Sequence, residues 1–287
     1  MSNIAFLGMG AMGTRIATHL LAARYSLHVW NRTPERCKPL VDQGATAYAS
    51  PKEAAQAAEV VIAMVADDQA SRQVWLDETN GAIYGLKGRA IALEYSTLTP
   101  GWSHELAGKM AALNHPFLAA PVVGSRPQAE AGKLIQLVGG DAATLATVQP
   151  ILESHSGVIH HVGDAAVSMA LKLSINTLFG IQVAALGEIL GMLQKAGMST
   201  ETAINWLSQM PTTSPALKGI GALIAAQNHA PLFPIDLVEK DFCYAQEFAQ
   251  SLEANVPAIE AVQKIYQQAQ KSGYGTKNIA GVAMLYS

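Results

Sequence analysis

An apolar run leads straight into three closely spaced glycines near the start of the chain: Ile4-Ala5-Phe6-Leu7-Gly8-Met9-Gly10-Ala11-Met12-Gly13. A helical pattern of apolar residues follows over 16–21. Because the glycines join a predicted strand to a predicted helix, G-x-G-x-x-G is here more specific than an ordinary glycine turn. Such a turn lets a pyrophosphate approach the backbone at the start of the helix. We therefore expect the dinucleotide cofactor to contact Gly8, Met9, Gly10, Ala11, Met12 and Gly13.

Three polar residues, Asn31, Arg32 and Thr33, follow a second predicted strand at Ser26–Trp30. A cofactor with a free ribose 2′-hydroxyl usually meets an Asp or Glu at this place, and this chain has neither. A guanidinium matches phosphate oxygens, so Arg32 can bind a 2′-phosphate while Asn31 and Thr33 hydrogen-bond nearby oxygens. The residues favour NADP(H) over NAD(H). The alternative is a solvated Arg32 and a loose choice of cofactor.

The composition argues against several classes of protein. The chain has 287 residues, half of them hydrophobic, which is enough for two domains or one large one. A net charge of −3 without any run of Lys and Arg argues against nucleic-acid binding. Cys37 and Cys243 suit a reducing compartment, and no Cys/His pair has the spacing of metal ligands. No basic leader opens the chain and polar residues interrupt its most apolar stretch, so we expect a cytoplasmic protein without a membrane span.

Strand-like apolar runs alternate with helical patterns over residues 1–163. After the first two strands, buried strands are expected at Glu59–Val65, Ala90–Glu94, Pro116–Ala120, Leu134–Val138 and Val158–Val162. This alternation predicts an α/β Rossmann domain with a doubly wound, mostly parallel sheet. Such sheets bind ligands beyond the carboxyl ends of their strands. We therefore assign Val65 and Thr97 to the cofactor and Ser96 to the substrate, with local turn capping as the alternative for the two hydroxyls.

The pattern changes after Gly163, where no convincing strand follows. A helix, apolar on most sides, is expected from about Asp164 to Ala196. Further helices are expected at Thr200–Gln209, Pro215–Gln227, Leu237–Leu252 and Pro257–Lys271, with a short one at the end. We therefore expect an all-helical substrate and dimerisation domain over residues 164–287, after an NADP-binding domain over residues 1–163. A helix that is apolar all round must be buried on all sides, and pairing with a second copy of the chain is one way to bury it.

Lys172 and Asn176 lie four residues apart on the long helix and so share one face. An ammonium on an apolar face needs a reason, because its desolvation is costly. Lys172 can donate a proton to a carbonyl oxygen as hydride arrives at the carbon, or take the hydroxyl proton in the reverse direction. Asn176 can orient the substrate or hold Lys172 in place. The alternative is a lysine whose stem runs along the core and whose amine reaches water.

Two further segments are weaker candidates. Gly124, Ser125 and Arg126 follow a predicted strand, where backbone N–H groups can hold an anion. Lys240 and Asp241 lie in a predicted helix, where the simpler interpretation is an exposed ion pair.

These motifs together resemble the β-hydroxyacid dehydrogenase family, which includes 3-hydroxyisobutyrate dehydrogenase and glyoxylate/succinic semialdehyde reductases and is related to 6-phosphogluconate dehydrogenase. The matching pieces are the glycine turn, Tyr95-Ser96-Thr97, Ala120–Ser125, Lys172–Asn176 and Glu239–Phe242. The resemblance implies NADPH-dependent hydride transfer to or from a small aldehyde, keto acid or 3-hydroxy acid, by a homodimer or homotetramer. It also implies that Lys172 is the catalytic acid/base, that Asn176 binds substrate, and that Lys240 lies near both cofactor and substrate.

The chain departs from the family in the substrate loop, which commonly reads Asp-Ala-Pro-Val-Ser-Gly. Ala119 and Val123 replace the Asp and the Ser, and that Ser commonly helps to hold the substrate carboxylate. We still expect Val123, Gly124 and Ser125 to contact the substrate, in a more apolar pocket. The departure leaves room for an imine reductase on the same scaffold, although those enzymes usually carry Asp or Tyr in place of Lys172. A non-catalytic NADP-binding protein is the third alternative, which the presence of Lys172 opposes.

Overall fold

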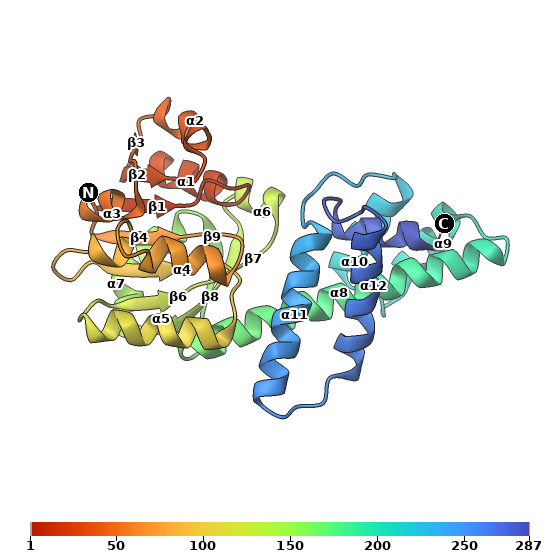
Figure 1. Cartoon of the computed structure of the whole chain (residues 1–287). Coiled ribbons are helices and arrows are strands. Elements are labelled where there is room, and N and C mark those ends of the chain that lie inside the picture. The colour runs from red at the N-terminus through yellow and green to blue at the C-terminus, as the bar shows by residue number, and fades with distance from the viewer. Residues whose placement is uncertain (1, 287) are drawn as a thin grey trace. The chain divides into compact units, whose positions relative to one another are not determined.

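The computed structural model describes residues 2–286, which divide into two compact units after Lys172 (Figure 1). The first unit combines strands and helices, and the second consists of helices. The strands are β1 (Asn3–Leu7), β2 (Ser26–Trp30), β3 (Thr46–Ala47), β4 (Val60–Ala63), β5 (Ile91–Glu94), β6 (Phe117–Ala119), β7 (Val122–Val123), β8 (Leu134–Gly140) and β9 (Ser156–His161).

The strands form one sheet in the order β3-β2-β1-β4-β5-β6-β8-β7, with β9 paired to β8. All pairs from β3 to β6 are parallel, whereas β8 runs antiparallel to β6 and β7. The chain builds outward from β1 in one direction through β3 and then returns to place β4 on the other side of β1. This confirms a doubly wound, mostly parallel sheet, whose order reverses between β1 and β4.

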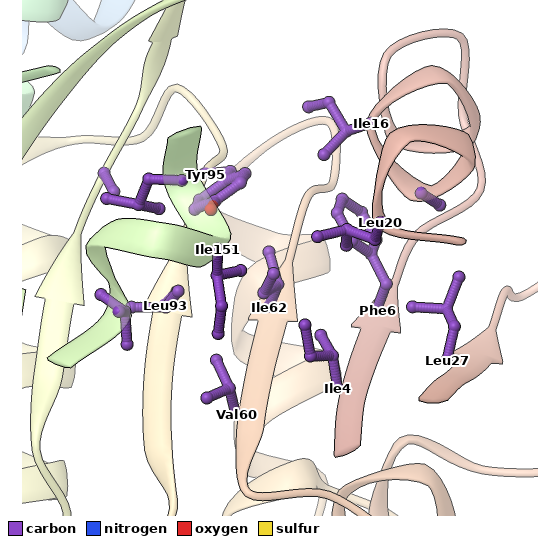
Figure 2. Close-up of a cluster of buried hydrophobic side chains, with 14 of the residues drawn as sticks. Ile4, Phe6, Ile16, Leu20, Leu27, Val60, Ile62, Leu93, Tyr95 and Ile151 are labelled. Atoms are coloured by element: carbon purple, nitrogen blue, oxygen red, sulfur yellow. The ribbon is translucent and has the colours of Figure 1, made fainter. Parts of the chain in front are cut away.

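Helices cover both faces of the sheet. They are α1 (Gly13–Ala22), α2 (Lys38–Val41), α3 (Pro51–Gln56), α4 (Asp68–Leu76), α5 (Pro100–Ala112), α6 (Arg126–Glu130) and α7 (Ala142–Glu153), with short 3₁₀ turns η1 (Pro34–Cys37) and η2 (Ala82–Tyr84). Alternate residues of each strand point to opposite faces. Phe6 and Ile62 therefore pack with α1 on one face (Figure 2), while Leu7 and Val61 pack with α4 and α5 on the other.

The second unit is built on α8 (Ala165–Lys195), which begins in the first unit. It also contains α9 (Thr200–Gln209), α10 (Pro215–Ala225), α11 (Ile235–Ser251), α12 (Pro257–Lys271) and a 3₁₀ turn η3 (Ile279–Leu285). By length and composition α8 is long and apolar enough to cross a membrane, but half of its most apolar window is buried in the fold. That burial fits the core helix that the sequence predicts.

Candidate active site

The glycine turn between β1 and α1 has the shape that the sequence predicts. Gly8 has a φ of +115°, and a Cβ there would lie 2.1 Å from the carbonyl oxygen of Met64. A Cβ on Gly13 would lie 2.0 Å from the carbonyl oxygen of Gly8, so both positions need glycine. A Cβ on Gly10 would instead meet nothing within 4 Å. This open space beside the backbone, at the start of a helix without acidic residues in its first turn, fits a bound phosphate.

Asn31 braces this turn. Its Oδ1 accepts a 2.9 Å hydrogen bond from the backbone N–H of Met9, and its Nδ2 donates a 2.8 Å bond to the carbonyl oxygen of Thr33. The sequence interpretation gave the Asn31 side chain to a ribose oxygen, but its amide oxygen already holds the turn in place. Arg32 and Thr33 follow it on the surface, with exposed side chains.

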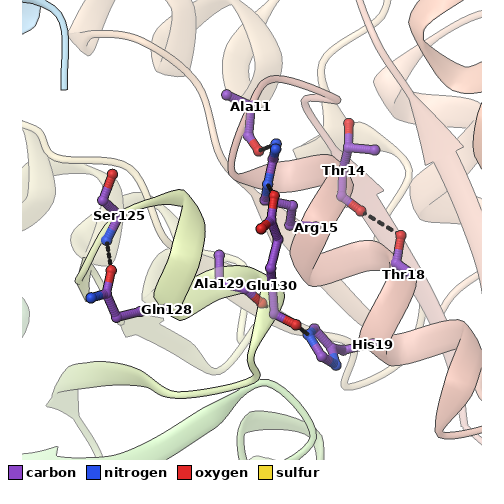
Figure 3. Close-up of polar contacts among 9 residues, drawn as sticks. All are labelled: Ala11, Thr14, Arg15, Thr18, His19, Ser125, Gln128, Ala129 and Glu130. Atoms are coloured by element: carbon purple, nitrogen blue, oxygen red, sulfur yellow. Dashed lines mark hydrogen bonds and ion pairs between the residues drawn. The ribbon is translucent and has the colours of Figure 1, made fainter. Parts of the chain in front are cut away.

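Polar contacts tie α1 to α6, the helix that follows the predicted substrate loop (Figure 3). Arg15 forms a 2.7 Å ion pair from Nε to Oε1 of Glu130, and its Nη1 donates a 2.7 Å hydrogen bond to the carbonyl oxygen of Ala11. His19 Nε2 lies 2.9 Å from the carbonyl oxygen of Ala129, so this nitrogen carries the hydrogen and donates it. The predicted cofactor turn and the predicted substrate loop are therefore fixed beside each other.

The predicted substrate loop, residues 123–125, has a conformation that its own backbone and the start of α6 fix. Val123 is half-buried at the end of β7, and Gly124 has a φ of +127°. The backbone N–H of Ser125 donates a 3.0 Å hydrogen bond to Oε1 of Gln128. This N–H is one of the donors that the sequence interpretation offered to an anion, and the helix cap of α6 uses it instead.

The ends of β4 and β5 are joined through Ser96. Its Oγ accepts a 2.8 Å hydrogen bond from the backbone N–H of Val65, and Ser96 is almost fully buried. Thr97, the next residue, is half-buried. A buried carboxylate, Glu94, accepts a 2.9 Å hydrogen bond from the Ser96 N–H. Sequence reasoning placed Glu94 in a strand and gave it no role, although an acidic residue that ends an apolar run was a signal that could have found it.

The first turns of α8 are anchored to the same end of the sheet. Ser168 Oγ donates a 3.0 Å hydrogen bond to the carbonyl oxygen of Leu137, and the backbone N–H of Leu98 lies 3.4 Å from Sδ of Met169. Leu98 follows β5 at its carboxyl end. Lys172 comes three residues after Met169 and four residues after Ser168, so it lies on the same face of α8 as these two residues. Lys172 is buried, with 6% of its surface exposed.

In the second unit, Asn176 donates a 2.6 Å hydrogen bond from Nδ2 to Oδ2 of Asp241. Lys240 Nζ lies 3.1 Å from the other carboxylate oxygen of Asp241 and 4.8 Å from the ring centroid of Tyr244. The interpretation of Lys240 and Asp241 as an exposed ion pair is wrong, because their side chains are only 17% and 3% exposed.

A close helix contact buries the carboxylate. A Cβ on Gly180 would lie 2.4 Å from Cε2 of Phe242, so glycine lets α11 approach α8. Tyr266 of α12 donates a 2.8 Å hydrogen bond from its hydroxyl to the carbonyl oxygen of Gly180 and packs against the Phe242 ring. Asp241, next to Phe242, is thereby held beside Asn176.

Two family models match the chain. The NAD-binding domain of 6-phosphogluconate dehydrogenase matches residues 3–163, and the NAD-binding domain of NADP-dependent 3-hydroxyisobutyrate dehydrogenase matches residues 167–286. The chain is 30% identical to glyoxylate/succinic semialdehyde reductase 2 of Arabidopsis thaliana over 98% of its own length and 78% of the relative. This chain belongs to the β-hydroxyacid dehydrogenase family.

Other similarities agree with this family. The 3-hydroxyisobutyrate dehydrogenase of Pseudomonas aeruginosa is 31% identical over 90% of this chain and 88% of the relative. A crystal structure of 3-hydroxyisobutyrate dehydrogenase from Salmonella typhimurium has the same fold, with a TM-score of 0.90 at 23% identity over 99% of this chain and all of the other. An imine reductase from Pseudomonas sp. reaches a TM-score of 0.65 at 23% identity over 99% of both chains. As a member of the family, the protein is an NAD(P)-dependent dehydrogenase or reductase that interconverts hydroxyl and carbonyl groups.

Proposed function

We propose that this β-hydroxyacid dehydrogenase is an NADPH-linked reductase of small aldehydes or keto acids, able to oxidise 3-hydroxy acids in reverse, with Lys172 as the general acid/base. The observation that carries the proposal is the buried position of Lys172 on α8, directly after the two residues that anchor this helix beyond the carboxyl ends of β5 and β6. Ligands of such sheets collect at this edge.

The residues divide the chemistry between them. Bound NADPH supplies the hydride that reduces the carbonyl carbon. Lys172, as its ammonium, gives a proton to the carbonyl oxygen, so that the product is an alcohol and the amine is left neutral. In oxidation the neutral amine takes the hydroxyl proton. Five residues bind and orient the substrate: Ser96, Val123, Gly124, Ser125 and Asn176. Lys240 contacts both the substrate and the cofactor.

The preference for NADPH is proposed on the basis of Arg32. No carboxylate stands at the end of β2 to accept a bond from a ribose 2′-hydroxyl, and the exposed Arg32 guanidinium is available to a 2′-phosphate. Thr33 and Val65 complete the cofactor contacts, with Thr97 beside them. Asn31 acts indirectly, because its amide oxygen holds Met9 and thereby the glycine turn.

We also propose that the protein is a homodimer or homotetramer through α8, and that it works in the cytoplasm. Exposed apolar side chains recur along one side of α8, at intervals of three, four, seven and eleven residues. They are Val167, Leu171, Leu178, Ile189 and Met192. Such a stripe is typical of a helix seam that a second helix covers. Sedimentation of wild-type protein and of a Leu178→Glu variant tests this, since the variant is expected to dissociate.

An imine reductase is the second candidate. It is favoured by Val123, an apolar half-buried residue in the loop where a hydroxyl would otherwise hold a carboxylate. The burial of Lys172 favours the first proposal. A spectrophotometric panel of carbonyl compounds and cyclic imines, each with NADPH and NADH in parallel, separates the two. Turnover of succinic semialdehyde or glyoxylate with NADPH supports the reductase, and turnover of cyclic imines alone would overturn it.

A further inference from the structure

Glu94 ends β5 in the parallel part of the sheet, and its side chain is completely buried. Its Oε2 accepts hydrogen bonds from Ser71 Oγ at 2.7 Å and from Trp75 Nε1 at 2.9 Å, both on α4. Its Oε1 accepts the 2.9 Å bond from the Ser96 N–H. None of the ion pairs among residues 2–286 includes Glu94. Three uncharged donors therefore satisfy this buried carboxylate.

The two indole N–H groups of the network have a fixed hydrogen-bond direction. An indole N–H can only donate, so Trp75 gives its hydrogen to Glu94, and Trp102 of α5 gives its hydrogen to Ser71 Oγ at 3.0 Å. Ser71 donates its own hydroxyl hydrogen to Glu94 Oε2. Burial raises the pKa of Glu94, and the hydrogen bonds from its partners oppose that shift. In its ionised form the Glu94 side chain accepts from all three donors at once.

The network continues from Glu94 to the proposed cofactor site. Glu94 fixes the backbone of Ser96, and Ser96 Oγ fixes the backbone N–H of Val65 at the end of the neighbouring strand β4. In the sheet, Glu94 is paired with Ala63, two residues before Val65. A single buried side chain thus sets the position of the two loops that follow β4 and β5.

We propose that Glu94 is a positioning residue for cofactor binding, which acts through Ser96 on the backbone of Val65. The inference rests on the proposed place of Val65 at the cofactor, because Ser96 reaches the cofactor site through its hydrogen bond to the backbone of Val65. The Glu94 carboxylate is held by Ser71 and Trp75 on α4, and Trp102 in turn holds Ser71. On the other side, Glu94 binds Ser96, which binds the backbone of Val65.

The decisive variant is Glu94→Gln. A glutamine has one oxygen, which accepts hydrogen bonds, and one NH₂, which only donates them. The NH₂ must therefore face either the two donors on α4 or the Ser96 N–H, and the donors that it faces lose their acceptor. Leaving a buried donor without an acceptor shifts the local backbone or costs the full desolvation of that group. We expect the Kd for NADPH, measured by fluorescence titration without substrate, to rise about tenfold, which corresponds to about 1.4 kcal/mol.

Ser156→Ala is the matched control. It removes another buried side-chain hydrogen bond of the same unit, the 2.8 Å bond from Ser156 Oγ to Gln136 Oε1, which joins β9 to β8 and includes neither the Glu94 side chain nor Ser96. It should lower the melting temperature but leave the NADPH Kd within twofold of wild type. Ser96→Ala should weaken NADPH binding. Adding Glu94→Gln to Ser96→Ala should weaken binding no further, because the hydrogen bond from the Val65 N–H to Ser96 Oγ is already lost.

The proposal is overturned if Glu94→Gln lowers the melting temperature and leaves the NADPH Kd unchanged, or if its effect adds fully to that of Ser96→Ala. Should Glu94→Gln not fold, Glu94→Asp is measured in its place, because a shorter carboxylate cannot reach both α4 and Ser96. The titration contains no carbonyl compound. A wrong substrate class would therefore appear as absent turnover with an intact wild-type Kd, which is distinguishable from a failure of this inference.

Discussion

The side-chain amide of Asn176 donates a 2.6 Å hydrogen bond to the carboxylate of Asp241, whose other oxygen lies 3.1 Å from the amine of Lys240. One buried carboxylate thus orients two side chains that we propose to contact the substrate. Orientation of this kind lowers the entropic cost of placing a reactant, so Asp241 matters to the site without touching the reacting atoms.

Replacing Asp241 with asparagine tests this role. Asp241→Asn leaves the half-buried Lys240 without its counterion, and we expect the free energy of unfolding to fall by about 1–3 kcal/mol. Asp42→Asn is the control, because Asp42 pairs with Lys38 on the surface and such pairs contribute about 0–1 kcal/mol. Thermal unfolding compares the two, and an Asp241→Asn protein as stable as the control would contradict the role given to this carboxylate.

The glycine turn gives a pair of opposite predictions. Gly8→Ala should destabilise the fold, because Gly8 has a left-handed φ and its Cβ would collide with the Met64 carbonyl. Gly10→Ala should melt near the wild-type temperature, since nothing lies within 4 Å of its Cβ, yet its Kd for NADPH should rise about tenfold or more. Melting curves and NADPH titrations of both variants measure this. Unchanged NADPH binding by Gly10→Ala would show that no phosphate lies there.

Much of this turn was readable from the sequence because its signal is local. The strand Ser26–Trp30 and the helices Thr200–Gln209 and Pro257–Lys271 also have the bounds that the sequence predicts. Strong start signals mark both helices: the Ser199 side chain caps one, and Pro257 begins the other. The two-residue strands β3 and β7 were missed, since two residues carry no periodicity. The short elements after β2, a 3₁₀ turn over Pro34–Cys37 and a helix over Lys38–Val41, likewise carry too few residues for a periodic signal.

The contacts between distant segments could not be read from the sequence. Nothing local shows that Asn31 would brace Met9, or that Lys240 and Asp241 would be buried. Both depend on partners many residues away, such as the approach of Phe242 to Gly180. Likewise β8 was expected to end before Gly139, but β8 includes both glycines, and a Cβ on Gly139 would collide with the start of α8. Tertiary packing decides these features.

Cofactor selectivity follows from Arg32. Arg32→Ser removes the guanidinium proposed to bind the 2′-phosphate, and hydrogen bonds to charged groups contribute about 1.5–3 kcal/mol. We expect the KM for NADPH to rise about tenfold to a hundredfold, with little change in the KM for NADH. Arg36→Ser is the matched control, since Arg36 is also exposed and lies in the next turn of the chain. Equal losses with both cofactors would remove Arg32 from selectivity.

A buried histidine gives the first unit an acid-sensitive stability. Burial lowers the pKa of His155 from 6.5 to about 3, so the folded protein keeps it neutral while the unfolded chain takes up a proton. Its contribution is fully present above pH 6.5 and is lost as the pH falls toward 3, by about 1.4 kcal/mol per pH unit. Chemical unfolding at pH 7 and pH 5 should show a smaller loss for His155→Phe than for wild type. The exposed His104→Phe variant should keep the wild-type loss, and identical losses in all three would contradict the assignment.

The central claim is that the buried amine of Lys172 moves the proton that accompanies hydride transfer. The direct measurement is kcat/KM of a Lys172→Met variant for the carbonyl compound that the panel identifies, together with its Kd for NADPH. We predict that kcat/KM falls by about 10²–10⁴-fold while NADPH binding stays within a few-fold of wild type. Lys195→Met, at the exposed end of the same helix, should keep full activity. A Lys172→Met protein that binds NADPH and turns over at the wild-type rate would contradict the claim.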